Sequence, residues 1–250
     1  MRILVCNDDG VDAPGLALLE RVAAKISSDV WVVAPDSKRT AGSSSLTIGR
    51  PLTIRTVSER RYSCSGTPAD CVVTAMAWLF RYEKAPDLVL AGINDGRNVA
   101  EDRAYSGTLG IAREATFWSI PAIGFSRVKR PVISPGDVDF LAGLAGSLWR
   151  SRDYWATDGH YLSINLPASL PAPIRQPKIG RDKIGRVAEL VSDEPGAATI
   201  LFPRGRPHST TEGDENELID AGYLCINRLD WIGEAPLTAD FLSSIERSAR

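Results

Sequence analysis

The chain has 250 residues, of which 44% are hydrophobic, with 29 basic and 31 acidic side chains. This length predicts one or two domains at roughly 100–200 residues per domain, and the hydrophobic content is too high for a disordered chain. The formal net charge of −2 argues against a general nucleic-acid binder, because such proteins concentrate Lys and Arg on one surface. Only His160 and His208 supply imidazole, so a multi-histidine metal centre is excluded and any metal ion needs oxygen or cysteine ligands.

The four cysteines form no C-x-x-C pair, and we expect them to be reduced and mostly buried. The N-terminal apolar stretch is short and turns acidic at Asp8, which is unlike a signal peptide. No apolar run reaches the roughly 18 residues that a membrane span requires. We therefore predict a cytoplasmic protein that binds neither a membrane nor a nucleic-acid polymer.

The first half of the chain alternates buried strands with helices. Continuous apolar runs predict strands over 3–6, 30–34, 88–91 and 120–125. Helical spacing of apolar residues predicts helices over 16–26, 69–82, 106–118 and 135–152. Thr67 and Pro68 form an N-cap and first-turn pair before the second helix. Because β-α-β units wind right-handedly, this half predicts a doubly wound, mostly parallel, Rossmann-like α/β sheet.

The second half differs in composition. Four prolines lie close together, and the apolar pieces become short and β-like, at 161–166, 187–191, 199–202 and 223–226. Hairpins or an arm fit this pattern better than continued β-α-β winding. A helix capped by Thr238 closes the chain. We predict a Rossmann-like core over 1–155 and a β-rich C-terminal part over 156–250, which contributes to the core and supplies a β-hairpin arm and the terminal helix.

Polar turns follow the predicted strands. Open α/β sheets bind ligands at the carboxyl ends of their strands, so these turns are the first place to look for a site. They can converge on one sheet edge. They comprise Asn7-Asp8-Asp9-Gly10, residues 35–42, residues 92–98 and, before a helix, Tyr105-Ser106-Gly107-Thr108.

Asp8 and Asp9 repel one another, and burying both costs free energy unless a cation or hydrogen-bond donors neutralise them. The alternative, an exposed Asx turn with Gly10 at positive φ, has about equal weight for the pair alone. Placing Thr40 and Asn94 at neighbouring strand ends favours a divalent ion, because carboxylate, amide and hydroxyl oxygens suit Mg²⁺ or Mn²⁺.

Ser106-Gly107-Thr108 opens a helix, where unpaired N–H groups and the helix dipole favour an anion. By itself the triplet is more often an N-cap. Beside a metal-binding turn it reads as a phosphate cradle. Lys38 and Arg39 can reach the same anion, although a solvated basic pair is an equally good interpretation.

Together these segments resemble the SurE family of survival proteins, which are metal-dependent nucleoside monophosphate phosphatases. The resemblance covers roughly the first half of the chain in unbroken order. In the second half only a few short segments match weakly. The most specific motifs are Asn7-Asp8-Asp9-Gly10 and Gly66-Thr67-Pro68-Ala69-Asp70-Cys71. The others are Ile3-Leu4-Val5, Val33-Ala34-Pro35-Asp36, Ser45-Leu46-Thr47, Pro86-Asp87-Leu88-Val89, Gly92-Ile93-Asn94 through Asn98, and Tyr105-Ser106-Gly107-Thr108.

The resemblance implies one divalent ion, Mn²⁺ or Mg²⁺, on Asp8, Asp9, Thr40 and Asn94. Thr40 departs from the family's usual serine. It also implies hydrolysis of nucleoside monophosphates at the 5′ or 3′ position, and a homodimer or homotetramer formed through extended C-terminal arms. The resemblance does not predict which base the substrate carries.

As a hypothesis, Asp8 and Asp9 are the catalytic residues that hold the ion, and one of them takes a proton from the attacking water. An aspartyl-phosphate route through Asp8 is chemically possible as well. The expected phosphate donors are Ser45, Asn98, Ser106, Gly107 and Thr108. Two other functions use similar sheet edges, a non-catalytic nucleotide- or phosphate-binding module and a sugar-nucleotide transferase. The transferase would need a second Rossmann-like half, which the proline-broken tail does not supply.

Overall fold

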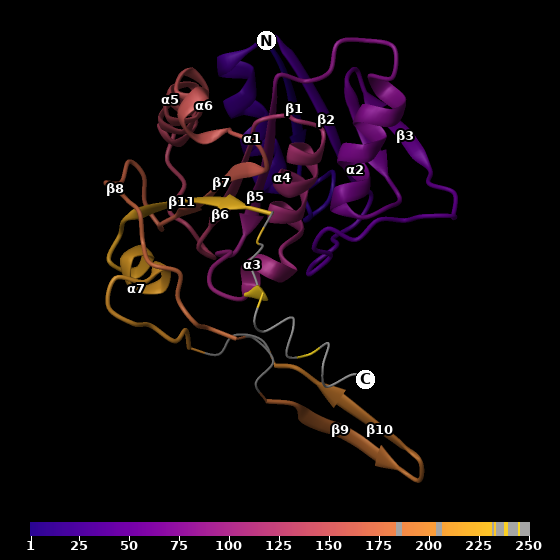
Figure 1. Ribbon diagram of the computed structural model, residues 1–250, viewed down its shortest axis with the longest axis vertical. Helices are drawn as coiled ribbons and strands as arrows, with labels where there is room; N and C mark the ends of the chain where they lie inside the picture. Colours follow the sequence, from indigo (N-terminus) through magenta and orange to yellow (C-terminus); the bar gives the residue numbers. More distant parts are fainter. Residues whose placement is uncertain (184–186, 204–206, 232, 234–237, 240–244, 246–250) are drawn as a thin grey trace.

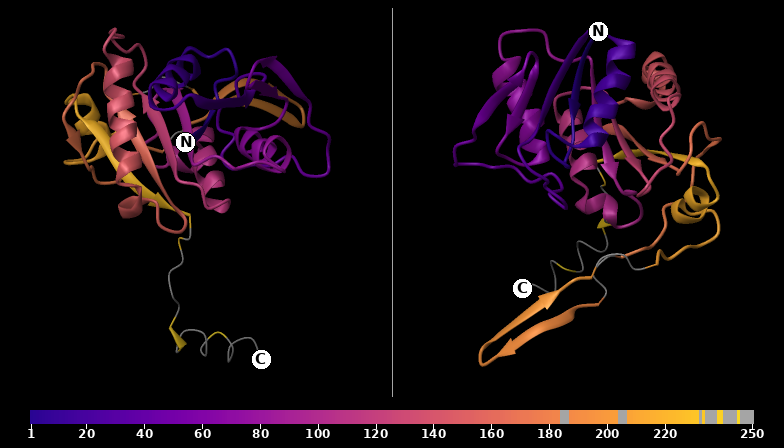
Figure 2. Two further views of the ribbon diagram at one scale, coloured as in Figure 1. Left: turned by 90° about the horizontal axis from the view of Figure 1, so that it is seen from above. Right: turned by 180° about the vertical axis from the view of Figure 1, so that it is seen from behind.

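The computed structural model describes residues 1–183, 187–203, 207–231, 233, 238–239 and 245. These residues form an α/β fold around a nine-stranded sheet of order β3-β4-β2-β1-β5-β6-β7-β11-β8, with helices on both faces (Figures 1 and 2). Pairing is parallel throughout the sheet except between β3 and β4 and between β7 and β11. The predicted fold class is confirmed.

The strands of the sheet are β1 (Arg2–Cys6), β2 (Asp29–Pro35), β3 (Ile54–Ser58), β4 (Arg61–Cys64), β5 (Leu88–Asp95), β6 (Ala122–Arg127), β7 (His160–Leu166), β8 (Ile174–Arg175) and β11 (Leu224–Asp230). The helices are α1 (Pro14–Ile26), α2 (Pro68–Thr74), α3 (Asp102–Tyr105), α4 (Gly107–Phe117), α5 (Asp137–Arg150), α6 (Arg152–Trp155) and α7 (Glu215–Asp220), with a π-helical turn η1 (Ala75–Leu79) after α2.

Strand β1 lies at the centre of two hydrophobic cores, one on each face of the sheet. Its alternate side chains Ile3 and Val5 pack with residues of α1 and α5, whereas Leu4 and Cys6 pack with residues of α2 and α4. Successive side chains of a strand point to opposite faces, so an unbroken apolar run suits a strand covered on both sides. All four cysteines are buried and free, as expected.

The strongest local signals in the sequence place the helix starts correctly. Pro14 occupies the first turn of α1, and Thr67 caps α2 through a capping box with Asp70. Two predicted helices divide: the one over 69–82 continues from α2 into η1, and the one over 135–152 is α5 followed by α6.

The structure corrects three expectations about strands. The turn predicted at 92–95 belongs to β5, where Asn94 and Asp95 pair with Ser126 and Arg127 after an irregularity in the register. Strands β3 and β4 were not predicted, because polar and charged residues interrupt their apolar pattern. The piece at 161–166 was expected in a hairpin or arm but is β7, parallel to β6, so the winding continues through it. Six of its seven residues are buried, which explains its continuous apolar run.

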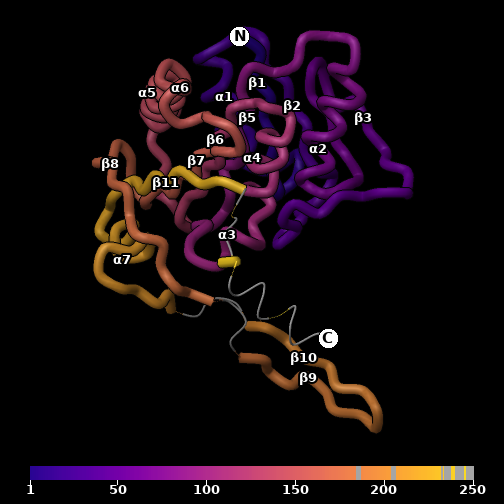
Figure 3. Tube along the Cα trace, viewed as in Figure 1, coloured from indigo at the N-terminus to yellow at the C-terminus, as the bar shows by residue number. Residues whose placement is uncertain are grey.

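A second sheet of two antiparallel strands, β9 (Glu189–Glu194) and β10 (Ala197–Leu201), forms the predicted hairpin arm. It projects away from the body of the molecule, as the chain trace makes clear (Figure 3). Most of the predicted terminal helix, 238–250, lies outside the described residues. The division of the chain at residue 155 stays a prediction, with the sheet extending across it. None of the helices within the described ranges is long and apolar enough to cross a membrane.

Candidate functional site

The turn after β1 lies where the strand order of the sheet reverses. Strand β1 is flanked by β2 and β5, which follow it along the chain in opposite directions across the sheet. Crevices at such switch points are the usual ligand sites of open α/β sheets. Asn7 shapes the turn, since its Nδ2 donates to the Gly10 carbonyl at 2.9 Å and its Oδ1 accepts from the Gly10 N–H at 3.2 Å. Gly10 has a φ of +107°, which favours glycine.

Asp8 faces the start of helix α4. Thr108 Oγ1 donates to Asp8 Oδ1 at 2.6 Å. A Cβ atom added to Gly107 would lie 2.7 Å from Asp8 Cβ and 3.0 Å from Asp8 Oδ2, so only glycine allows this approach. Asp8 is 5% exposed, which rules out the alternative of a fully exposed Asx turn. Residues 8, 107 and 108, which the sequence placed in one site, are therefore in contact.

Burial raises the pKa of Asp8 to about 6, because removal from water disfavours the carboxylate. The hydrogen bond from Thr108 opposes this increase, and the negative charge of Asp9 adds to it. Positive charge placed between the two carboxylates would favour their ionised forms.

Asp9 connects the acidic turn to the end of β5. Its Oδ2 accepts a hydrogen bond from the Asp95 N–H at 3.0 Å, one residue beyond Asn94. Its Oδ1 forms an ion pair with the ammonium group of Lys38, and the hydrogen bond to Asp9 raises the pKa of Lys38. The Lys38 side chain is 48% exposed, and therefore has room to move away from Asp9. This contact shows that the acidic edge attracts a cation.

The donor set at this edge fits a hard divalent ion. Asn94 Nδ2 donates to the Gly96 carbonyl at 2.9 Å, so its nitrogen is engaged and its oxygen accepts no hydrogen bond from the residues that the structure describes. Two carboxylates and an amide oxygen suit Mg²⁺ or Mn²⁺. Within the described ranges, no three His, Cys, Asp or Glu side chains are grouped to hold a metal ion. The expected set contains only two carboxylates, so neutral oxygens would complete it.

Thr40 lies in the loop that follows β2, next to Arg39, which joins this loop to the acidic turn. The N–H of its neighbour Arg39 donates to the Asp8 carbonyl at 2.7 Å. Thr40 itself is exposed. The Arg39 guanidinium binds the Asp36 carboxylate and the Ser65 carbonyl, which leaves Lys38 as the member of the basic pair that faces the site.

The predicted phosphate donors differ in what their side chains contact. The Thr108 hydroxyl donates to Asp8, so its main-chain N–H is the donor left for an anion. Ser106 Oγ caps α4 by accepting from the Leu109 N–H at 3.1 Å, as the N-cap interpretation predicted, and its hydroxyl donates to no group in the part of the chain that the structure describes. Ser45 Oγ donates to the Gly42 carbonyl, and Asn98 Nδ2 donates to Ser126 Oγ. No hydrogen bond or ion pair among the described residues joins Ser45 or Asn98 to the acidic turn.

The Gly66–Cys71 motif holds the loop that contains Ser45 in place through hydrogen bonds. Asp70 accepts from the Thr67 N–H at 2.8 Å and from both the N–H and hydroxyl of Thr47, while Thr67 Oγ1 donates to the Ser45 carbonyl at 2.5 Å. The sequence predicted the Thr67 cap, but its function in holding the loop was missed, because Thr47 and Asp70 are 23 residues apart.

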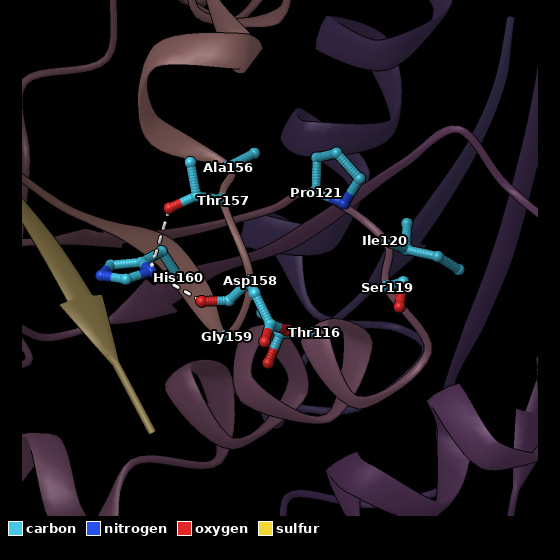
Figure 4. Close-up of a pocket in the computed structure, with 9 residues that line it drawn as sticks. All are labelled: Thr116, Ser119, Ile120, Pro121, Ala156, Thr157, Asp158, Gly159 and His160. Carbon is cyan, nitrogen blue, oxygen red and sulfur yellow. Dashed lines mark hydrogen bonds between the residues drawn. The ribbon is translucent and has the colours of Figure 1, made fainter. Parts of the chain in front are cut away.

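A separate cavity of about 270 Å³ lies at the amino-terminal ends of the strands, opposite the end that carries the acidic turn. Ile120, Pro121 and His160 line it where β6 and β7 begin (Figure 4). His160 Nδ1 lies 2.8 Å from the Asp158 carbonyl oxygen there. Since Asp8 and Asp9 lie at the carboxyl end of the strands, this cavity is not part of the candidate site.

The fold and the site define a doubly wound α/β protein whose acidic switch-point turn contacts a helix N-terminus. A sequence model of the family described as "Survival protein SurE" matches residues 3–189, and the chain belongs to this family. The "5'-nucleotidase SurE" of Paramagnetospirillum magneticum is 37% identical over 240 residues, covering 92% of this chain and 89% of the relative. The protein of the same name from Rhizorhabdus wittichii is 40% identical over 250 residues, covering 96% and 98%. The crystal structure of the SurE protein from Aquifex aeolicus superimposes with a TM-score of 0.75 at 28% identity, covering all of both chains.

Proposed function

We propose that this protein is a divalent-metal-dependent phosphatase that hydrolyses nucleoside monophosphates to nucleoside and phosphate, acting at the 5′ or 3′ position. The observation that carries the proposal is the contact between the buried Asp8 carboxylate and the first turn of α4 through Thr108 and Gly107. A place for a cation thus lies directly beside a place for an anion. The names of the two relatives support the nucleotide as substrate.

The chain's own groups have distinct functions in this proposal. Asp8, Asp9, Asn94 and Thr40 hold one Mn²⁺ or Mg²⁺ ion. When bound, such an ion supplies charge that stabilises the transferring phosphoryl group and makes water a better nucleophile at neutral pH. The main-chain N–H groups at the start of α4 orient the phosphate, since they have no partner within the helix and lie at its positive end.

Proton transfer falls to the acidic pair. Asp8 and Asp9 are the carboxylates next to the expected phosphate position, and one of them accepts the proton of the attacking water. Asp8 is held in one orientation by Thr108, and Asp9 by the Asp95 N–H. Fixed orientation of this kind places a general base within reach of the nucleophile before the substrate binds.

A phosphate-release assay tests the proposal. The purified protein is incubated with adenosine 5′-monophosphate and Mn²⁺, with and without excess chelator, and free phosphate is measured. We expect release that the chelator abolishes and that added Mn²⁺ restores. Binding of the nucleotide without release would identify the protein as a non-catalytic nucleotide-binding module instead.

We also propose that the β9–β10 arm joins copies of this chain into a homodimer or homotetramer. Every residue of both strands is exposed, including the apolar Leu190, Val191, Ile200 and Leu201. A two-stranded hairpin by itself is marginally stable in water, and an exposed apolar surface of this kind favours association. Light scattering at micromolar concentration should therefore give at least twice the mass of one chain, and the mass of a single chain would contradict the proposal.

A further inference from the structure

The loop between β5 and α4 carries Asn98 and leads to Ser106, and α7 holds it from outside the first half of the chain. Glu215 Oε2 accepts a hydrogen bond from the Ala100 N–H at 2.9 Å. Ala100 has a φ of +48°, a left-handed conformation that costs an alanine free energy. The hydrogen bond from this N–H to a fixed acceptor stabilises the left-handed conformation, which is unfavourable for an alanine by itself.

The Glu215 carboxylate is 1% exposed and forms an ion pair with Arg103 of α3, which is 7% exposed. Arg103 Nη2 also donates to Asn227 Oδ1 of β11 at 2.7 Å. Buried charges are tolerated when they are paired and hydrogen-bonded. Removing one partner leaves the other buried without compensation for its lost hydration, which is strongly destabilising. Glu215 is therefore fixed in place by α3 and β11, and in turn fixes Ala100 three residues before Arg103.

The same carboxylate oxygen reaches the segment that leads to the arm. Glu215 Oε2 accepts from the Gly180 N–H at 3.1 Å. Two residues further on, the Asp182 N–H donates to Glu101 Oε2 at 2.7 Å. Residues 100–103 are thus joined to residues 180–182 through Glu215 and through Glu101, although the chain between them forms β6, β7 and β8.

We propose that Glu215 is a positioning residue for the candidate active site. It holds residues 98–106 in the conformation in which the start of α4 meets Asp8, and Arg103 and Asn227 are the groups that hold Glu215 in place. This inference rests on the proposed phosphatase function for its kinetic readout. It concerns residues of α3, α7 and β11 that contact neither the expected ion nor the phosphate.

Two variants of Glu215 separate positioning from general stability. Glu215→Ala removes both the acceptor and the charge, and we expect its KM for adenosine 5′-monophosphate to rise on the order of tenfold, the lower end of the range for outer-shell residues. Glu215→Gln keeps an acceptor oxygen for the Ala100 N–H, so its KM should rise less. Mn²⁺ affinity should be retained in both, because Asp8, Asp9 and Asn94 lie outside the loop.

Rescue and a matched control complete the kinetic test. Ala100→Gly removes the steric cost of the left-handed backbone, so in the Glu215→Ala background it should return KM toward the wild-type value without restoring the melting temperature. Asp137→Asn breaks the ion pair of Asp137 with Arg127, which is equally buried, and should lower the melting temperature with KM unchanged.

Amide hydrogen exchange measured without substrate provides a readout that does not require activity. Residues 99–105 should exchange faster in Glu215→Ala than in wild type, and the Asp137→Asn control should leave them unchanged. If wild type shows no phosphatase activity, the proposed function fails while this measurement still decides the positioning claim.

Loss of melting temperature with unchanged KM and unchanged exchange of residues 99–105 would overturn the proposal, because the ion pair would then be structural only. If Glu215→Ala does not fold, Glu215→Gln and Asn227→Ala decide the question through the same two readouts. The absence of any change in KM and in exchange in both variants would also overturn it.

Discussion

The side chains at the carboxyl ends of the central strands and those of the β9–β10 arm differ in burial and in the partners they contact. At the sheet edge, Asp8 is buried and both acidic side chains have partners within the chain, Thr108 for Asp8 and Lys38 for Asp9. In the arm, every strand residue is exposed and apolar side chains such as Val191 and Ile200 face solvent. The difference indicates that the site is organised by the single chain, and it fits our proposal that the arm is organised by association with another copy.

The largest effect should follow a change at the sheet edge. Asp8→Ala removes a proposed ion ligand and general base, and we expect phosphate release to fall by about 1,000-fold or more, since single groups that stabilise a transition state contribute 100- to 1,000-fold by themselves. The fold should be retained, because loss of a buried carboxylate removes a group whose burial is costly. Wild-type activity in a folded Asp8→Ala protein would remove Asp8 from the mechanism.

A smaller effect at the same edge tests whether Thr108 acts through Asp8. Thr108→Val keeps the shape of the side chain but removes the hydroxyl that donates to Asp8. We expect a loss of Mn²⁺ affinity or activity of about 10- to 100-fold, which is typical for residues that orient a ligand. Thr116→Val, in the last turns of the same helix, is the matched control and should leave the Mn²⁺ titration unaltered.

The arm should respond through assembly rather than through chemistry. Val191→Asp combined with Ile200→Asp places charges on the exposed apolar surface, so the mass by light scattering should fall to that of one chain. The control Ser192→Asp adds a charge at a polar position and should leave the mass unchanged. A mass that stays at the wild-type value in the double variant would mean that the copies meet through another surface.

The smallest effect concerns Thr40. Thr40→Ser keeps the hydroxyl and should change kcat/KM by less than about threefold, whereas Thr40→Val, which lacks it, should lose about tenfold as an oxygen ligand is removed. Equal kcat/KM values for the two variants would show that the Thr40 hydroxyl is not a ligand.

The sequence predicted those parts of the molecule whose cause is local. The apolar run before Asn7 and the cap at Thr67 each follow from neighbouring residues, and the structure confirms the strand and the helix. Strand β7 was misassigned because a buried strand of the sheet and a short piece of an arm have the same length and composition.

The features that the sequence did not predict depend on residues that are far apart along the chain. Ala100 and Glu215 are 115 residues apart, and nothing near either residue indicates the other. The same holds for the Thr108 hydroxyl, which was expected to bind phosphate but donates to Asp8, 100 residues away. Local patterns thus predicted which turns form the candidate site, and tertiary contacts determine which atoms each side chain faces.

The central claim is that the turn after β1 and the end of β5 hold one divalent ion next to the start of α4. Anomalous diffraction from a crystal grown with Mn²⁺ tests it most directly. The account predicts one strong peak per chain, within ligand distance of Asp8, Asp9 and Asn94, that is lost in a crystal of Asp9→Ala. A crystal with Mn²⁺ bound only elsewhere, or with the peak unchanged in Asp9→Ala, would contradict it.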